Sequence, residues 1–396
     1  MADPLSVNVS PLGRLIPRFA VRTFSEWLTS PAMMAVLCRA ANPRPQPVNL
    51  STARSLLVVK LDDIGDFVLA TPFLRELRRN APQATITLVV KRSVSNLAES
   101  CPHVNGVLTF DGQAAGGSAW LLRRHWRALS FARRHLRPQH FDVAVIPRWD
   151  VDPYLATALA AFAGARAVVG FSDRTTALKR AHNRGFDRLL TDAISPEGHQ
   201  GHEVNHNLSL LTAMGGTAVS TSLELWLTDD DHAIAAARLP ERDRYVAIAT
   251  GAAETHRRWS ANHFARLALT LRDRYSLTAV LLGEASDPAV AGAIDFRGQT
   301  TLRQAAAMLK RCHLFVGNDS GVKHLAAAVG TSVVEISGFR AGGDPNHNHS
   351  PTRFHAWGVP QRVVQPAAGR GDFGIEDVSV AAVEAAVAEM LRKGQS

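Results

Sequence analysis

Residues 55–80 read SLLVVKLDDIGDFVLATPFLRELRRN and determine how the first half of the chain folds. The run 55–60 is apolar and of strand length, and 67–80 has the character of a helix. The polar loop 61–66 lies between them, where a parallel sheet presents its loops to a ligand. We therefore expect a strand, a ligand-facing loop and a helix, the beginning of a parallel βαβ unit.

The same pattern continues along the chain and then restarts. Apolar strands are expected at 84–90, 104–110, 141–147 and 166–171, and after a polar connection at 245–250, 277–283, 313–319 and 332–337. Apolar strands separated by helices predict two α/β halves with mostly parallel sheets facing one central cleft. The predicted parts are an N-terminal extension and linker (1–54), a first Rossmann-like domain (55–216), an interdomain connection (217–244), a second Rossmann-like domain (245–376) and a C-terminal helix (377–396).

Composition narrows the class of protein and of partner. The 396 residues carry a formal net charge of +9, which favours an anionic partner such as a phosphorylated substrate or an anionic membrane. The charge is dispersed and not interleaved with aromatics, so nucleic-acid binding is not expected. Three distant cysteines argue against a disulfide framework and favour a reducing cytoplasm. No apolar run is long enough to span a membrane, and the first residues lack a signal-peptide pattern.

Residues 12–40 have the pattern of a basic amphipathic helix. Arg14, Arg18 and Arg22 recur every fourth residue and so share one side of a helix, while apolar residues from Leu15 to Leu28 recur at roughly helical spacing. Such a helix either lies on an anionic membrane surface, here the inner face of the inner membrane, or packs against the body of the protein. The sequence leaves both interpretations open.

Two polar turns at predicted strand ends are candidates for chemistry. Asp66 follows Gly65 at the start of a helix, where it is either a helix cap or a general base facing the cleft. Ser320 and Gly321 follow the strand ending at Asp319, where their backbone N–H groups either form an anion site suited to a diphosphate or belong to a capped helix that binds no ligand. Lys323 or His324 would add a donor from the next helical turn.

Charged residues after other strands complete the candidate site. Arg257 and Arg258 follow the first strand of the second half, where they either suit a leaving diphosphate or form a surface charge pair, and Trp259 would fix their loop by packing. Acidic side chains after the next strand could accept hydrogen bonds from ribose hydroxyls, or simply begin a solvated helix. Basic side chains after the strands of the first half would meet an acidic acceptor. The acidic pair is Glu284 and Asp287, and the basic set is Lys91, Arg92 and Arg148.

Other patterns point to different activities. His202-Glu203-Val204-Asn205-His206 matches H-E-x-x-H, the zinc metalloprotease motif, and would make the protein a zinc hydrolase if a third ligand existed. Neither the dinucleotide fingerprint G-x-G-x-x-G after the first strand nor a G-x-x-x-x-G-K-[ST] P-loop is present, which argues against an oxidoreductase or a P-loop nucleotidase. A third alternative is a non-catalytic protein that binds a nucleotide sugar or anchors an assembly at the membrane.

Three segments, taken together, resemble glycosyltransferase family 9, the ADP-heptose:lipopolysaccharide heptosyltransferases. They are LLVVKLDDIGDFVLATPFLRELRRNAP (56–82), HEVNHNLSLLTAMG (202–215) and LRQAAAMLKRCHLFVGNDSGVKHLAAAVGTSVVEISG (302–338). The resemblance implies a GT-B fold and inverting transfer from ADP-heptose without a metal or other cofactor. The resemblance also implies that the H-E-x-x-H match is part of a family helix before the interdomain connection and not a zinc motif. Residues 339–358 depart from the family pattern, being longer and rich in histidine.

The resemblance also implies roles for individual residues. Asp66 would be the base, and Arg257, two residues before Trp259, would contact phosphate. A sugar and diphosphate would be held by Asp319, Ser320, Gly321 and His324, and the ribose by Glu284 or Asp287. The acceptor would be a lipopolysaccharide core or a related anionic glycan.

Overall fold

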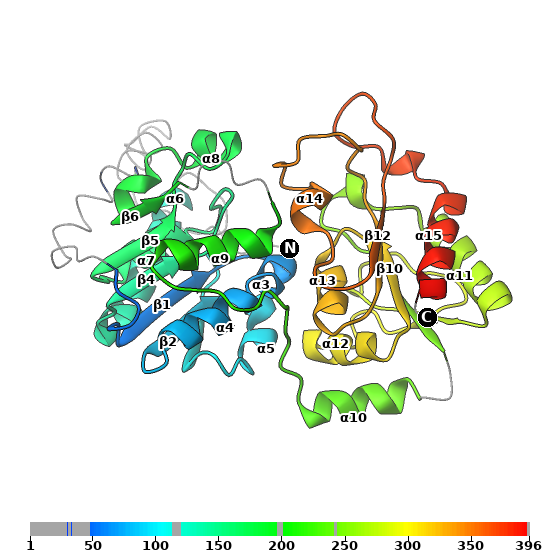
Figure 1. The fold of residues 1–396 in the computed structure, drawn as a ribbon, viewed down its shortest axis with the longest axis horizontal. Helices are drawn as coiled ribbons and strands as arrows, with labels where there is room; N and C mark the ends of the chain where they lie inside the picture. The colour runs from blue at the N-terminus through cyan, green and yellow to red at the C-terminus, as the bar shows by residue number, and fades with distance from the viewer. Residues whose placement is uncertain are drawn as a thin grey trace, which may run out of the picture.

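The computed structural model describes residues 30, 33, 48–112, 120–195, 201–240 and 244–393. The amphipathic segment predicted at 12–40 therefore lies outside the described residues, apart from Ser30 and Met33. The chain forms two α/β halves that lie side by side, joined by a connection that runs through α10 (Figure 1). No helix among the residues described has both the length and the hydrophobicity needed to cross a membrane.

Each half contains a six-stranded, fully parallel sheet. The first has the order β3-β2-β1-β4-β5-β6 and the second the order β12-β11-β10-β7-β8-β9, so both are wound alike. The first sheet consists of β1 (Ser55–Lys60), β2 (Thr85–Val90), β3 (Gly106–Thr109), β4 (Val143–Ile146), β5 (Ala167–Phe171) and β6 (Asp192–Ile194). The second consists of β7 (Tyr245–Ala249), β8 (Thr278–Leu281), β9 (Ile294–Asp295), β10 (Leu314–Asn318), β11 (Val333–Ile336) and β12 (Gln361–Val364).

Helices cover both faces of each sheet, which is why the central strands are continuous apolar runs. In the first half they are α3 (Ile64–Val68), α4 (Thr71–Asn80), α5 (Ser95–Ala98), α6 (Trp120–Phe131), α7 (Ala156–Phe162), α8 (Ala177–His182) and α9 (Glu203–Ala213). Then follow α10 (Asp229–Arg238), α11 (Ala261–Tyr275), α12 (Leu302–Lys310), α13 (Gly321–Ala328), α14 (Pro351–Phe354) and α15 (Val380–Lys393). This arrangement confirms the predicted fold class.

Some predicted elements differ from those in the structure. The helix expected at 67–80 is two helices, α3 and α4, because Pro72 lacks an N–H and its ring would clash with the carbonyl of Val68. The connection after residue 217, expected only as a polar segment between the two halves, contains the helix α10. Thr228 and Asp231 form a reciprocal capping box that begins this helix. The short edge strands β6, β9 and β12 were also missed.

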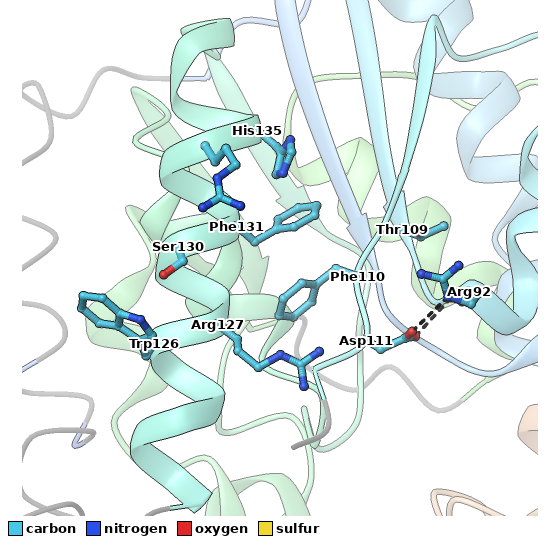
Figure 2. Close-up of a pocket in the computed structure, with 10 residues that line it drawn as sticks. Arg92, Thr109, Phe110, Asp111, Trp126, Arg127, Ser130, Phe131 and His135 are labelled. Carbon is cyan, nitrogen blue, oxygen red and sulfur yellow. Dashed lines mark hydrogen bonds and ion pairs between the residues drawn. The ribbon is translucent and has the colours of Figure 1, made fainter. Parts of the chain in front are cut away.

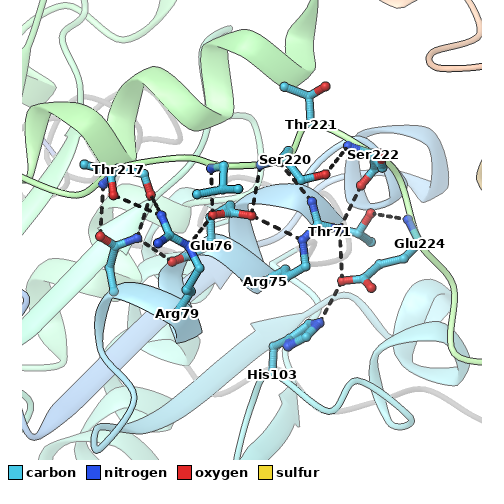
Figure 3. Close-up of polar contacts among 12 residues, drawn as sticks. Thr71, Arg75, Glu76, Arg79, His103, Thr217, Ser220, Thr221, Ser222 and Glu224 are labelled. Carbon is cyan, nitrogen blue, oxygen red and sulfur yellow. Dashed lines mark hydrogen bonds and ion pairs between the residues drawn. The ribbon is translucent and has the colours of Figure 1, made fainter.

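Hydrogen bonds hold the interdomain connection against α4, and the buried carboxylate of Glu76 accepts several of them (Figure 3). Glu76 accepts hydrogen bonds from the backbone N–H groups of Val219, at 3.0 Å, and Ser220, at 3.3 Å. Its other partners are the guanidinium groups of Arg75 and Arg79, and Arg75 also donates to the carbonyl oxygens of Ser220 and Ser222. The connection therefore leaves the first half along a fixed path.

Candidate active site

Several of the candidate residues lie at the two points where strand order reverses. In the first sheet the reversal separates β1 from β4, and the loops after these strands carry Asp66 and Arg148. In the second it separates β7 from β10, and the loops there carry Arg257 and Ser320. Ligands of doubly wound sheets bind at such reversal points, beyond the carboxyl ends of the strands.

The two reversal points face each other in direct contact. A Cβ placed on Gly65 would lie 2.7 Å from Cδ2 of His324, and one placed on Gly321 would lie 2.9 Å from Cβ of Ile64. Only glycine fits at both positions, so α3 and the start of α13 approach through their backbones. The loop containing Asp66 and the helix start after Ser320, which the sequence predicts on opposite sides of one cleft, are therefore neighbours.

Asp66 combines partial exposure with a perturbed acidity. It lies in the first turn of α3, which begins at Ile64, and 23% of its side chain is exposed. Burial raises the pKa of Asp66 to about 6; Arg148, whose Nη1 lies 3.8 Å from Oδ2, opposes this, and the neighbouring charge of Asp62 reinforces it. Asp66 is therefore a carboxylate at neutral pH that takes up a proton more readily than an ordinary aspartate.

The predicted basic residues of the first half take three different positions. Arg148 contacts both Asp62 and Asp66, so it lies within the site. Lys91 pairs with Asp63 at 2.6 Å and lies over the ring of Tyr154. Arg92 is 79% exposed and lies beside a cavity of about 420 Å³ lined also by Phe110, Asp111 and residues of α6 (Figure 2). Among the described residues, those that line this cavity all belong to the first half.

On the opposite side, Asp319 is held between two cations. Its Oδ2 lies 3.3 Å from Nη1 of Arg257, and its Oδ1 accepts a hydrogen bond of 2.6 Å from Lys323. Burial would raise the pKa of Asp319, but Lys323 and Arg257 lower it. Lys323 is completely buried and pairs also with Glu335 at 2.8 Å. The idea that Lys323 reaches a ligand is therefore wrong, because both its carboxylate partners lie inside the protein.

Within the described part of the chain, two buried polar atoms at the start of α13, Ser320 Oγ and His324 Nδ1, have no hydrogen-bond partner. Buried polar atoms are normally satisfied, so such atoms at a strand end are suited to a ligand. Burial and the nearby Lys323 lower the pKa of His324 well below its usual value, so its imidazole is neutral. A neutral imidazole suits a hydroxyl group better than it suits a phosphate charge.

Most of the remaining candidates of the second half form hydrogen bonds with backbone groups and so stabilise the loops that contain them. Arg258 donates to the carbonyl of Ala252 at 2.8 Å. Trp259 is buried and its indole N–H donates to the carbonyl of Val378 at 2.8 Å, so it fixes the loop as expected. Glu284 is exposed, whereas Asp287 accepts a hydrogen bond of 2.8 Å from the Glu284 backbone. Of these two carboxylates, Glu284 is the one left facing solvent.

The H-E-x-x-H motif does not form a zinc site. His202 caps the start of α9 and its Nε2 lies 2.9 Å from the carbonyl of His355, whereas the ring of His206 stacks on Trp149 at 3.9 Å. Glu203 pairs with Arg353 at 2.8 Å. His202 precedes the helix, and His202, Glu203 and His206 are each used in packing or pairing.

Sequence reasoning missed a buried ion cluster between the halves. Arg353, on α14 of the second half, has no exposed surface and pairs with two carboxylates of the first half, Glu203 at 2.8 Å and Asp150 at 2.7 Å. The His-rich stretch that contains Arg353 looked like a polar loop, so nothing in it predicted a fully buried arginine. The one signal in the sequence was that residues 339–358, which include Arg353, depart from the family pattern.

Comparison with known proteins agrees with this geometry. Residues 131–366, more than half of the chain, match the family model of glycosyltransferase family 9 (heptosyltransferase). The lipopolysaccharide heptosyltransferase 3 of Escherichia coli K12 is 24% identical over 288 residues, covering 69% of this chain and 79% of that protein. A family 9 glycosyltransferase from Veillonella parvula superimposes with a TM-score of 0.69 at 20% identity, covering 87% of this chain and 99% of that one.

A second solved structure carries a ligand. The heptosyltransferase WaaC of E. coli with ADP superimposes with a TM-score of 0.60 at 18% identity, covering 86% of this chain and 99% of that one. At such identities the solved structures establish the fold, and the family match establishes the relationship. The family model matches more than half of the chain, and the two parallel sheets have the fold of the solved family members. This chain is therefore a glycosyltransferase and belongs to glycosyltransferase family 9.

Proposed function

We propose that the protein transfers a heptose from ADP-heptose to an anionic acceptor of the lipopolysaccharide-core type, by single displacement with inversion and without a metal ion. The observation that carries this proposal is the partly exposed carboxylate of Asp66, of raised pKa, next to the start of α13. The domains proposed are 55–216 for the acceptor and 245–376 for the donor. ADP in the related WaaC structure and the name of the E. coli relative support the choice of donor and acceptor.

In the proposed reaction Asp66 acts as the general base. The acceptor hydroxyl gives its proton to the Asp66 carboxylate while its oxygen attacks the anomeric carbon of the donor. The bond from that carbon to the diphosphate oxygen breaks on the opposite face, and the electron pair leaves with ADP. One attack from the opposite face inverts the configuration at the anomeric carbon.

The leaving diphosphate is stabilised by groups of the second half. The N–H groups at the start of α13, at Ser320 and Gly321, carry the positive end of the helix dipole. Arg257 adds a guanidinium group, which is held in place by its ion pair with Asp319. Positioned donors of this kind contribute about 3 kcal/mol each to the transition state. Ser320 Oγ and His324 Nδ1 would form hydrogen bonds with hydroxyl groups of the donor sugar. Glu284 or Asp287 would accept hydrogen bonds from its ribose.

The acceptor would approach from the first half. Arg148, Lys91 and Arg92 follow β4 and β2 at the same sheet edge as Asp66, where they would attract carboxylate or phosphate groups of the acceptor. We further propose that the protein works in the cytoplasm, where residues 12–40 allow a peripheral contact with the inner membrane. The net charge of +9 supports contact with an anionic surface.

Donor binding is tested by thermal shift with a panel of nucleotide sugars, in EDTA because the proposed displacement uses no metal. ADP-heptose should raise the melting temperature more than UDP-glucose or GDP-mannose, since a ligand that binds only the folded state stabilises it. Arg257→Gln should weaken ADP-heptose binding about 10- to 100-fold, as expected for loss of a charged contact of about 1.5–3 kcal/mol. Arg266→Gln, an exposed position on α11, is the control. Equal shifts from all three donors would refute the donor assignment.

The base role predicts a specific pH dependence. Since Asp66 must be deprotonated to accept a proton, and its pKa is raised to about 6, kcat/KM should fall as pH drops below about 6. Arg148 lowers this pKa, so Arg148→Gln should move the acid limb to higher pH. Arg166→Gln, an exposed residue paired with Asp142, should leave the limb unmoved. An acid limb that is the same in wild type and Arg148→Gln would argue against Asp66 as the titrating group.

A further inference from the structure

The His-rich loop after β11 brings a histidine against the loop that carries Arg257. His349 comes from this loop, whereas Glu254 and His256 belong to the segment after β7. His349 Nε2 lies 3.1 Å and His256 Nε2 lies 3.4 Å from the same oxygen, Oε2 of Glu254. One ligand atom from each of the three residues lies within 4.8 Å of the other two. Two segments about 90 residues apart in the chain therefore converge on one point.

From this geometry we infer that Glu254, His256 and His349 form a binding site for a divalent transition-metal ion, such as zinc. Two imidazoles and one carboxylate are a ligand set that such ions accept, with a coordination position left open. Ligand atoms bound at about 2.0–2.2 Å in a tetrahedral site lie about 3.3–3.6 Å apart, close to the two separations to Glu254 Oε2. The transfer proposed above uses no metal, so the site goes beyond that function.

The state of the two imidazoles fits this role. Within the described residues, His256 Nε2 is buried and makes no hydrogen bond, which leaves it free to bind an ion. Both rings are held by Phe373, whose centroid lies 3.9 Å from that of His256 and 5.6 Å from that of His349.

The surrounding charges also allow a cation to bind. Arg257 lies 3.2 Å from Glu254 Oε2 and opposes the ion, but its Nη1 lies 3.3 Å from Asp319. Two carboxylates thus flank one guanidinium, and the more distant Lys323 is neutralised by Glu335 as well as by Asp319. Glu254 is 45% exposed, so an ion can reach it from solvent. A bound ion would tie the loop 339–350 to the segment that carries Arg257.

The site is tested by direct binding to the full chain without donor or acceptor, so the result does not depend on sugar transfer. EDTA-treated protein carrying Cys38→Ser, which removes one competing thiol, is titrated with zinc by calorimetry and with cobalt(II) by visible absorption. We expect one equivalent of zinc and an intense cobalt absorption typical of a four-coordinate ion. His349→Ala and His256→Ala should each weaken zinc binding at least about 100-fold, since loss of a ligand costs at least as much as loss of a supporting contact.

His232→Ala, at an exposed position on α10, is the matched control and should bind zinc like the parent. The metal-free melting temperature of each variant shows whether it remains folded, and zinc should raise it in the parent and the control but not in the two site variants. Absence of zinc binding at micromolar concentration in the parent would overturn the inference. So would one equivalent bound with unchanged affinity in both folded site variants, because the ion would then lie elsewhere.

Discussion

Asp66→Asn should reduce sugar transfer about 100- to 10,000-fold, the range expected when a general base is removed. Asparagine has nearly the shape of aspartate but cannot take the acceptor proton. Donor binding should remain within a few fold, because the proposed diphosphate contacts come from Arg257 and the start of α13 in the other half. The measurement is kcat with saturating donor, together with ADP-heptose affinity from the thermal shift.

The choice of control matters, because three aspartates lie within five residues. Asp62 is buried and paired with Lys60 and Arg148, so its replacement would disturb the fold. Asp63 is 72% exposed and pairs with Lys91, which makes Asp63→Asn the matched control for a lost carboxylate in the same loop. Turnover in Asp66→Asn comparable to that of Asp63→Asn would remove Asp66 from the role of base.

The second large effect is expected from Arg353→Ala. Removing this guanidinium would leave Glu203 and Asp150 buried without their cation, and breaking a buried ion pair in this way costs about 3–5 kcal/mol. Arg353 comes from the second half and its partners from the first, so the loss should also weaken the contact between the halves. Urea unfolding should show a lower midpoint, and two transitions in place of one if the halves separate.

Two further variants test whether pairing is the cause. Arg362→Ala removes a mostly exposed arginine that pairs with Glu389 at 3.4 Å, and such pairs contribute about 0–1 kcal/mol. Adding Glu203→Gln to Arg353→Ala removes one of the uncompensated charges and should recover part of the lost stability. A stability equal to that of the parent in Arg353→Ala would show that the cluster does not hold the halves together.

Glu203 gives the same cluster a pH dependence. Burial would raise its pKa, but Arg353 and His206 lower it well below the usual value. A carboxyl whose pKa is depressed in the folded state stabilises the protein above its unfolded pKa of about 4.5. That contribution is lost as pH falls through the acidic range. The cluster therefore stabilises the contact between the halves at neutral pH.

Much of the local structure follows from neighbouring residues. The apolar runs before Leu61 and Asp319 are strands because they are buried on both faces, and the loops after them are polar because they emerge at the sheet edge. Pro72 divides the helix after β1, and the Thr228–Asp231 pair begins α10; both signals are visible in the sequence. Their consequences depend only on residues within one or two turns, although the single helix expected at 67–80 and the polar connection expected after residue 217 took neither signal into account.

Pairings between distant residues could not be predicted in this way. The motif around Glu203 looks like a zinc site until His202 is found against His355, and Glu203 against Arg353, 150 residues away. Lys323 looks like a ligand donor until its buried partners Asp319 and Glu335 are known. Hydrogen-bond and charge partners decide what a polar side chain does, and here they come from other strands or from the other half.

The sequence by itself determined two parallel α/β halves, polar segments at Asp66 and Ser320 after two of their strands, and the resemblance to family 9, because periodicity and turn chemistry are local properties. Only the tertiary structure decided that Gly65 and Gly321 bring these loops into contact, that burial raises the pKa of Asp66, and that Arg353 joins the halves. It alone placed His349 against Glu254 and His256. Burial and the charge of distant neighbours exist only once the chain has folded.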